Sequence, residues 1–509
     1  MTIKRLPYFA NGEFKPSQTT QWMDCYDPST GQVIAQAPQC TVAEVEEAVA
    51  AAAAAFPAWA DTPASKRVQV LFRMKALLDR HLDELTYLVA QEHGKVWDEA
   101  MGDVLKVTEV VEFACGIPHL MKGPALMNCT PGYDTAQYME PLGVFVGIAP
   151  WNFPGMIPMG WMAPLCVATG NTLVLKAASF TPQTSMRIAE LWQEAGLPKG
   201  VINVVTCSRH EAEILLTHPD VKGITFVGST PVGRHIYATA AAAGKRVQAL
   251  TEAKNHALVL KDAALERTAR GIVNSACGCA GERCMALPTV VAEESIADEL
   301  VAWLVKLMQE LKMGPASDKT SQLGPMVNAD HRQSVIAWIE KGVEEGATLV
   351  LDGRGATVPG YEEGFYLGPT LFDHVQPGMT IGDREIFGPV LCIKRVPDFE
   401  TGLALMNRNE FANGSVIYTG SGHYAREFAH RTHGGMVGIN VGIPVPLGVF
   451  GFTGHKNSFF GDLHTMGTDG VRFFTQLKSV TAHWFSDEEA RAGKVLNSWD
   501  GMISMPDAR

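Results

Sequence analysis

The pattern of hydrophobic and polar positions changes near residue 143, from a long helical stretch to short apolar runs that alternate with helical patterns. Residues 41–93 are predicted to be helical, because Thr41 and Glu44 form a capping-box signature and apolar residues recur at helical spacing from Leu71 to Leu85. After residue 143 we expect strands at 143–148, 172–175, 201–205, 224–227 and 246–250, with helices near 183–194, 211–218 and 232–243. This alternation predicts a parallel, doubly wound α/β sheet that binds ligands at the carboxyl ends of its strands.

A second β/α series follows from about residue 256 to 445, and it predicts a second α/β domain. Its strands are expected near 256–260, 289–292, 391–396 and 414–418, and its helices near 296–311 and 329–345. Between the helical stretch and the first strand, the segment 125–142 is rich in polar and turn residues, and we expect a protruding hairpin there. Residues 487–509 are polar and mixed, which is typical of a tail or arm.

Length, net charge, apolar runs and cysteine spacing exclude several classes of protein. The 509 residues exceed what one hydrophobic core usually organises, so at least two domains are expected. A net charge of -12 argues against nucleic acid as a partner, and no apolar run approaches the ~20 residues of a membrane helix. The N-terminus lacks a secretory signal, so a cytoplasmic location is the default expectation. The ten cysteines have no C-x-x-C pair or regular spacing, so neither a disulfide framework nor a metal site is expected.

The segment 274–285 is the first candidate for chemistry, since it places three cysteines, Cys277, Cys279 and Cys284, among glycines. Glycine lets the backbone approach a ligand closely, and Arg283 beside Cys284 favours the thiolate, which is the nucleophilic form of cysteine. The alternative is a buried core cysteine without a chemical role. This stretch alone favours that alternative, because it contains no histidine to act as a base.

Four further motifs surround this segment in a fixed order. They are Ala149-Pro-Trp-Asn-Phe-Pro154, Leu175-Lys176, Phe226-Val-Gly228-Ser229-Thr-Pro-Val-Gly233 and Glu385-Ile-Phe387-Gly-Pro389. Taken together, the five segments resemble the aldehyde dehydrogenase superfamily over about residues 8–485. The resemblance implies an α/β aldehyde dehydrogenase fold with a Rossmann-like cofactor domain, an α/β catalytic domain and a small β oligomerisation arm. We therefore expect a dinucleotide-binding domain at 1–124 and 143–252, a catalytic domain at 253–445, and an oligomerisation arm with a C-terminal tail at 125–142 and 470–509.

The resemblance implies that Cys284 is the nucleophile and that Asn152 assists it. An aldehyde loses hydride readily only after a nucleophile has converted it to a tetrahedral adduct, and a thiolate does this by forming a thiohemiacetal. The adduct carries an oxyanion, which in the resembled family is bound by the side-chain amide of the asparagine and the backbone N–H of the nucleophile. An asparagine after a strand is otherwise an ordinary turn or cap residue.

The cofactor residues are implied in the same way. The turn at Gly228 and Ser229, closed by Gly233, is expected to open a helix whose N-terminus faces the pyrophosphate of NAD. The other expected contacts are Ala149, Pro150, Trp151, Phe153, Lys176, Glu385 and Phe387. Ser179 departs from the family pattern, because NAD-preferring members usually have a glutamate there that binds the ribose hydroxyls. Without that carboxylate a 2′-phosphate is not repelled, so NADP stays open beside NAD.

The segment 250–256 further resembles the CoA-acylating methylmalonate-semialdehyde dehydrogenases. Hydrolytic members of the superfamily have a glutamate at the position of Leu250, which activates the water that cleaves the thioester. A leucine cannot take a proton, so the acyl-enzyme is expected to wait for the thiol of coenzyme A (CoA), which serves as co-substrate. Members of this group convert malonate or methylmalonate semialdehyde to acetyl-CoA or propionyl-CoA with loss of CO₂.

The substrate of that group carries a carboxylate, which needs a cation. Arg283 offers a bidentate fork beside the nucleophile. The family's second arginine falls on Lys106, which retains the charge without the fork, although a lysine is more commonly a solvated helix residue. Glu252 stands where a small residue is usual. If residues 250 and 252 face the same side of an extended strand, Glu252 could supply the missing base.

Three functions therefore compete. The first is a CoA-acylating semialdehyde dehydrogenase, and the second is a hydrolytic NAD(P)-dependent enzyme with Glu252 as base, giving a free acid. The third is an inactive relative with a structural or nucleic-acid-binding role, which neither the acidic charge nor the intact Cys284, Asn152 and Glu385 supports. For the active enzymes the partners are a small semialdehyde and CoA, with no nucleic acid or membrane. The resemblance also implies a homodimer or homotetramer, bridged by 125–142 and a strand at 475–485.

Overall fold

The computed structural model describes residues 3–492, and its largest sheet has eight strands in the order β22-β12-β11-β8-β9-β10-β2-β3. The five central strands, from β12 to β10, run parallel, and β22 and β2 add antiparallel edges. The strands are β2 (Tyr8–Ala10), β3 (Glu13–Lys15), β8 (Val144–Ile148), β9 (Thr172–Lys176), β10 (Ile202–Val205), β11 (Val221–Val227), β12 (Arg246–Leu250) and β22 (Phe459–Phe460).

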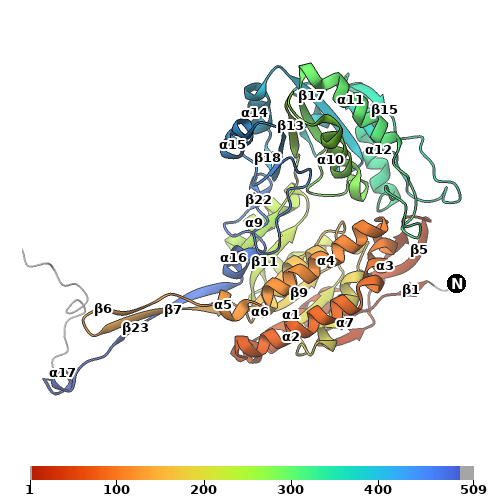
Figure 1. Cartoon of the computed structure of the whole chain (residues 1–509). Helices are drawn as coiled ribbons and strands as arrows, with labels where there is room; N and C mark the ends of the chain where they lie inside the picture. Colours follow the sequence, from red (N-terminus) through yellow and green to blue (C-terminus); the bar gives the residue numbers. More distant parts are fainter. Residues whose placement is uncertain (1–2, 493–509) are drawn as a thin grey trace, which may run out of the picture.

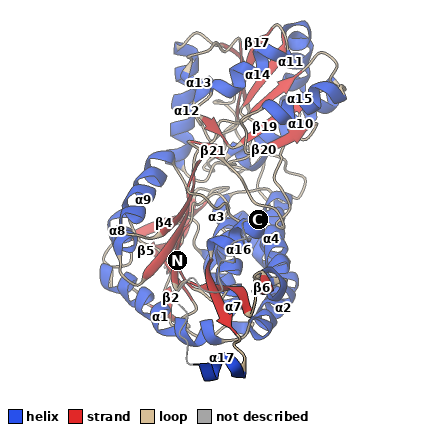
Figure 2. Cartoon of the chain, turned by 90° about the vertical axis from the view of Figure 1, so that its left-hand side faces the viewer, coloured by secondary structure: helices blue, strands red, loops and turns tan. Residues whose placement is uncertain are grey.

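Helices cover both faces of this sheet (Figure 2). One face packs on α1 (Val42–Asp61), α8 (Arg209–Thr217) and α9 (Thr230–Ala242), and the other on α2 (Ala64–Arg80), α3 (Leu82–His93), α4 (Trp97–Ala114), α6 (Ala163–Ala168) and α7 (Gln183–Glu194). Along β8 the side chains alternate between these cores, since Val144 and Val146 belong to the first and Phe145 to the second. Because both faces are buried, these strands read as continuous apolar runs.

The second sheet has seven strands in the order β15-β16-β17-β14-β13-β19-β20, all parallel except β15. They are β13 (His256–Val259), β14 (Thr289–Glu293), β15 (Thr348–Leu351), β16 (Thr370–Asp373), β17 (Val390–Val396), β19 (Gly414–Tyr418) and β20 (Met436–Ile439). Its helices are α10 (Leu265–Cys277), α11 (Glu294–Gln309), α12 (Ala329–Glu344), α13 (Thr380–Asp383), α14 (Phe399–Arg408) and α15 (Gly422–Arg431). In Figure 1 the two sheets lie in separate lobes, one above the other.

A three-stranded antiparallel arm projects from the lobe that contains the first sheet (Figure 1). It consists of β6 (Ala125–Thr130), β7 (Tyr133–Pro141) and β23 (Thr475–His483), and β7 pairs with β23 along its whole length, from Pro141 with Thr475 to Tyr133 with His483. The helix α17 (Asp487–Ala492) follows at the tip. Most residues of β6 and β23 are exposed, and those of β7 are mostly half-buried.

Smaller elements complete the described chain. The N-terminal strands β1 (Lys4–Arg5), β4 (Trp22–Asp27) and β5 (Gln32–Pro38) form a three-stranded sheet, and β18 (Phe411–Ala412) pairs with β21 (His455–Lys456). The remaining helical segments are α5 (Ile117–Leu120), the π-helix Met156–Met162, the 3₁₀ turn Gly278–Gly281 and α16 (Gly467–Phe473).

Most expected elements are confirmed, and the capping box of α1 forms as expected, with Thr41 and Glu44 hydrogen-bonded to each other's backbone. One inference is wrong. The strand β12 ends at Leu250, and residues 251–255 lie in a loop, so Leu250 and Glu252 are not on one face of an extended strand. The sequence pattern also missed α4 and the edge strand β22, which returns to the first sheet from beyond residue 445. Residues 493–509 of the expected tail lie outside the described residues.

Candidate active site

The candidate nucleophile follows an unusual backbone turn between the two lobes. After α10 ends at Cys277, three consecutive residues adopt left-handed conformations, with φ of 51° at Cys279, 51° at Ala280 and 73° at Gly281. Two of the three are not glycine, so the turn is strained and needs outside contacts to persist. A side chain at position 281 would lie 2.1 Å from the carbonyl oxygen of Gly388. The turn therefore packs directly against the segment that contains Glu385 and Phe387.

Two buried asparagines fix the backbone at Cys284. The Nδ2 of Asn255 donates to the carbonyl oxygens of Cys284 and Ala286, each at 2.8 Å, and the Nδ2 of Asn413 donates to that of Cys284 at 3.2 Å. The Oδ1 of Asn255 in turn accepts from the N–H of Gly414 at 2.7 Å. Both asparagines come from segments that precede strands of the second sheet, so that sheet sets the position of the nucleophile.

Burial and the Glu385 carboxylate raise the pKa of the Cys284 thiol to about 12, and the positive charge of Arg283 acts in the opposite direction. The thiol is half-buried, whereas Cys277 and Cys279 are fully buried. All ten cysteines are free, so the segment contains no disulfide. Access distinguishes Cys284 from the other two cysteines of this segment, whereas the positive charge of Arg283 also acts on Cys279.

Asn152 lies next to the nucleophile segment, as expected from its motif. It follows β8 and is 3% exposed, and its Nδ2 donates to the main-chain carbonyl of Glu282 at 3.1 Å. The amide is thus fixed two residues before Cys284. An amide nitrogen has two N–H groups, and this contact uses one of them.

The two expected cations each have a carboxylate partner. The Nη2 of Arg283 lies 3.3 Å from Oε1 of Glu99 and 3.3 Å from the sulfur of Cys279, while the same Oε1 accepts from the N–H of Cys279 at 2.7 Å. Lys106 pairs with Glu109 on the same turn of α4, at 2.9 Å. Glu99 therefore braces both the left-handed turn and the arginine beside the nucleophile.

The expected cofactor turn leads from β11 into α9. The N–H of Gly228 donates to the carbonyl oxygen of Leu250 at 3.1 Å, and Ser229 is the N-cap residue of α9. Gly233 allows close packing, because a side chain there would lie 2.3 Å from the methyl group of Thr251. The carboxylate of Glu252 accepts from the N–H of Thr230 at 3.2 Å, so it lies at the N-terminus of this helix.

Glu385, Phe387 and Ser179, three more of the expected cofactor residues, each contact a second segment of the chain. Glu385 accepts from the N–H of Ala253 at 3.1 Å, and burial, with the nearby charge of Glu252, raises its pKa to about 8. The ring of Phe387 packs edge-on against that of Trp151, with centroids 5.5 Å apart. The Oγ of Ser179 accepts from Gln39 at 3.1 Å.

Backbone and packing contacts tie the remaining cofactor candidates to the first lobe. Ala149 donates its N–H to the carbonyl oxygen of Lys176 at 3.1 Å, while burial lowers the pKa of the Lys176 amine. Pro150 is half-buried between Ala149 and Trp151. Phe153 lies under the ammonium group of Lys95, which is 3.4 Å from the ring centroid.

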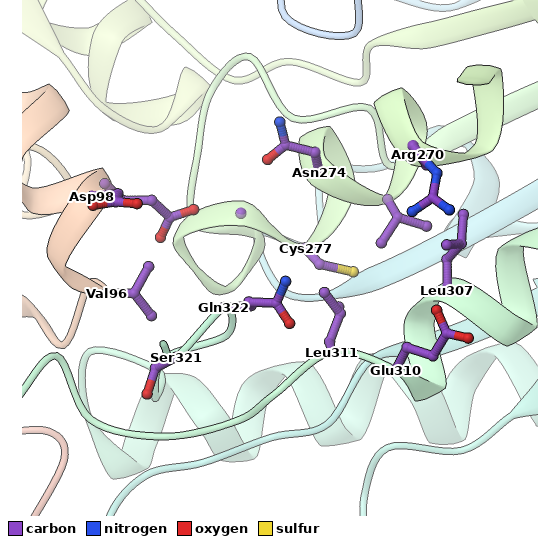
Figure 3. A pocket seen from close by; sticks show the side chains of 13 residues that line it. Val96, Asp98, Arg270, Asn274, Cys277, Leu307, Glu310, Leu311, Ser321 and Gln322 are labelled. Carbon is purple, nitrogen blue, oxygen red and sulfur yellow. The ribbon is translucent and has the colours of Figure 1, made fainter. Parts of the chain in front are cut away.

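A pocket of about 370 Å³ borders the nucleophile segment (Figure 3). It lies between the start of α4 and the ends of α10 and α11, and its lining includes Asp98, Glu99, Cys277 and Gln322. Cys284 is not part of the lining. The pocket therefore borders the turn that Glu99 braces and does not include the thiol of Cys284.

Sequence analysis did not find several residues that shape the site. Glu99, Asn413, His93 and His331 lie far from Cys284 in the sequence, and Glu282 lies two residues before it. No local pattern indicates the first four, because only the folded chain brings them to the segment. Only Glu282 could have been found from the sequence, because it is an acidic residue within the nucleophile segment itself.

Within the described residues, no helix is both long and apolar enough to cross a membrane, and no cluster of His, Cys, Asp and Glu side chains could bind a metal ion.

Comparisons with known proteins agree with this geometry. The model of the aldehyde dehydrogenase family matches residues 14–480. A malonate-semialdehyde dehydrogenase of Geobacillus thermodenitrificans is 47% identical over 483 residues, covering 95% of this chain and 99% of the relative. A relative of the same name in Pseudomonas aeruginosa is 45% identical over 480 residues, covering 94% and 96%. The chain therefore belongs to the aldehyde dehydrogenase family.

Solved structures extend the likeness to the fold. The crystal structure of a methylmalonate-semialdehyde dehydrogenase from Oceanimonas doudoroffii superposes with a TM-score of 0.94 at 43% identity. The match covers 96% of this chain and 100% of that one. A Sinorhizobium meliloti protein assigned to the same activity superposes with a TM-score of 0.94 at 41% identity, covering 96% and 99%, and its structure contains NAD. The expected aldehyde dehydrogenase fold is thus confirmed.

Proposed function

We propose that the protein oxidises malonate or methylmalonate semialdehyde with NAD and CoA, giving acetyl-CoA or propionyl-CoA with loss of CO₂. The observation that carries this proposal is that a braced Cys284 packs on the same apolar cluster as Leu250, which ends β12 and is only 5% exposed. The names of the relatives from Geobacillus and Pseudomonas support the same substrate class.

The first chemical step uses the thiol of Cys284. The thiolate adds to the aldehyde carbon and forms a thiohemiacetal, whose oxygen becomes negatively charged. Asn152 retains an amide N–H beyond its bond to Glu282, and this group, with the backbone N–H of Cys284, would stabilise that oxygen. NAD, when bound, accepts the hydride that leaves the adduct, and a thioester on Cys284 remains.

The acyl group then needs a second nucleophile. Because Leu250 cannot take a proton, water at this position is not activated, and the thioester persists until the thiol of CoA attacks its carbonyl carbon. Before that exchange, the thioester lies beta to the substrate carboxylate, so the C–C bond breaks with release of CO₂ and leaves a thioester enolate that takes up a proton. CoA then carries away the two- or three-carbon acyl group and restores the thiol of Cys284.

Arg283 is the proposed partner of the substrate carboxylate. Glu99 contacts only its Nη2, so the other guanidinium nitrogens remain for a second carboxylate. Lys106 is a less suitable partner for the substrate carboxylate, because its ammonium group is already paired with Glu109.

The cofactor turn fits a dinucleotide. Ser229 makes no side-chain cap bond to α9, and because Glu252 occupies the N–H of Thr230 and residue 231 is proline, the N–H of Val232 is left for a pyrophosphate. Gly228 and Gly233 would keep the turn close to the sheet, and Glu385 and Lys176 would bind the two riboses. Because Ser179 lacks a carboxylate, NADP remains a second candidate cofactor.

The alternative hydrolytic function needs Glu252 as the base that activates water. The contact between its carboxylate and the N–H of Thr230 supports a place at the cofactor turn instead.

We also propose that the arm serves self-association, because it exposes Leu126, Met127, Tyr138 and Leu477, which a second copy would cover. The cytoplasmic location stays a prediction.

Product analysis with malonate semialdehyde tests the proposal. We expect acetyl-CoA and reduced nicotinamide to form together, with turnover falling at least ~100-fold when CoA is omitted, because the acyl-enzyme accumulates. Cys284→Ala is expected to lose activity by at least about 10⁴-fold, whereas Cys277→Ala should stay close to wild type. Free acid formed at full rate without CoA would contradict the proposal, and loss of that rate in Glu252→Gln would establish the hydrolytic alternative.

A further inference from the structure

A buried group of titratable side chains lies directly behind the nucleophile segment and has no part in the chemistry above. It consists of Glu282, His93 at the end of α3 and His331 on α12. The Oε2 of Glu282 lies 3.6 Å from Nε2 of His93, and its Oε1 lies 3.6 Å from Nε2 of His331. The side chain of Glu282 is fully buried and that of His93 is 1% exposed. The group joins the first lobe, the second lobe and the segment that contains Cys284.

The hydrogen bonding within this group is incomplete without one proton. Oε1 of Glu282 accepts from the N–H of Val327 at 3.0 Å, but Oε2 has no partner, and neither ring nitrogen of His93 has one. His331 already uses Nε2 on the carbonyl oxygen of Phe387, at 2.8 Å. A single proton on Oε2, donated to Nε2 of His93, would satisfy two orphaned buried atoms after a small approach.

The surroundings favour that proton on the carboxyl group. Burial raises the pKa of Glu282 well above its usual range, and burial lowers the pKa of both His93 and His331. The ammonium group of Lys95 opposes the shift at Glu282, but it is itself paired with Asp103 at 2.8 Å in the protein interior. These shifts favour a neutral group, with the carboxyl group as donor and His93 as acceptor.

Glu282 is connected to the expected catalytic groups through its backbone. Its main-chain carbonyl accepts from Nδ2 of Asn152 at 3.1 Å, so any rotation of residue 282 moves the amide proposed to bind the oxyanion. On the other side, His331 supports the carbonyl of Phe387, whose φ of 61° is left-handed. The ring of Trp151 lies between the two histidines, with its centroid 5.8 Å from that of His93 and 5.2 Å from that of His331.

We propose that Glu282 is a positioning residue, whose protonated carboxyl group bonds to His93 and so fixes the backbone carbonyl that orients Asn152 beside Cys284. The inference rests on the proposed function, because it takes Asn152 as the donor to the oxyanion. The direction in which turnover depends on pH follows from the need for the protonated carboxyl group. Below the raised pKa the proton is present and the amide is oriented, and as the pH rises through that value a buried carboxylate forms and turnover falls.

A double-mutant cycle on kcat tests the connection. Asn152→Ala is expected to lower kcat by ~100-fold or more, and Glu282→Leu by ~10- to 100-fold with KM little changed. If Glu282 acts through Asn152, the double variant loses no more than Asn152→Ala alone. Glu282→Gln retains an acceptor for Val327 and a donor for His93, so it should recover most of the loss and should lack the fall in kcat at alkaline pH.

Glu92 provides a matched control on the same helix as His93. It is also a buried glutamate, with a pKa raised by burial to about 7, but its carboxylate accepts from the backbone of Gln183 and Thr184, away from the nucleophile. The fold losses in kcat of Glu92→Leu and Asn152→Ala should therefore multiply in the double variant. Thermal unfolding and NADH binding verify that each variant is folded. If Glu282→Leu does not fold, the pH profile of kcat in Glu282→Gln is the test of the proposal.

The inference is overturned if the losses of Glu282→Leu and Asn152→Ala multiply, if Glu282→Gln is no better than Glu282→Leu, or if the alkaline fall persists in Glu282→Gln. A wild-type protein that forms no reduced nicotinamide with the semialdehyde contradicts the proposed function instead, so the two failures are distinguishable.

Discussion

Two backbone turns meet at the candidate site, and they differ in backbone strain. The turn before Cys284 is strained, with non-glycine residues in left-handed conformations, and side chains from distant segments brace it. The cofactor turn at 228–233 contains no residue with a positive φ, and its contacts include a backbone bond from Gly228 to Leu250, the Glu252 carboxylate on the N–H of Thr230 and the Thr230 hydroxyl on the carbonyl of Asn457. The nucleophile turn therefore needs its braces to hold strained residues, whereas the cofactor turn has no strained backbone to hold.

Among substitutions that test this comparison, the largest effect is expected from removing a brace of the nucleophile turn. Asn255→Ala leaves the carbonyls of Cys284 and Ala286 and the N–H of Gly414 without this partner. Each buried group without a partner costs about 1–3 kcal/mol, so we expect stability to fall by ~3 kcal/mol and turnover by ~100-fold. Chemical denaturation and steady-state kinetics measure the two quantities.

The matched control for this variant is Asn203→Ala. Asn203 is also a buried asparagine with backbone partners, among them Gly200 at 2.8 Å and Asn11 at 2.9 Å, but it belongs to the far side of the first sheet. It should lose comparable stability and little turnover of the folded enzyme. Equal losses of turnover in both variants would mean that the nucleophile turn depends on its braces no more than any other buried backbone does.

The contrast between the turns also explains what could be predicted from sequence. The capping box at Thr41, the alternating strands and the turn at Gly228 are local patterns, and the structure contains all three. The left-handed turn at Cys279 and Ala280 has no local signal, because neither residue type favours that conformation. The inference about Glu252 failed for a related reason, since β12 ends at Leu250 and the chain turns away under contacts from Ser458.

An intermediate effect is expected from the arginine beside the nucleophile. Arg283→Lys retains a positive charge but loses the planar fork that matches a carboxylate, so kcat/KM for malonate semialdehyde should fall about tenfold, or about 1.4 kcal/mol. The same variant should lose much less with propanal, which has no carboxylate. Equal losses with both aldehydes would assign Arg283 to bracing the turn with Glu99, and would remove it from substrate recognition.

The smallest effect is expected at the cofactor turn, where Glu252 occupies the N–H of Thr230 and lies close enough to Glu385 to raise its pKa. A dinucleotide phosphate at this helix end would meet a like charge, so Glu252→Gln should tighten NADH binding by about threefold, measured by fluorescence titration. Glu213→Gln, which changes an exposed glutamate paired with His235, controls for net charge and should not alter the affinity. Weaker NADH binding in Glu252→Gln would mean that this carboxylate organises the turn, and that the cofactor side also depends on a side-chain brace.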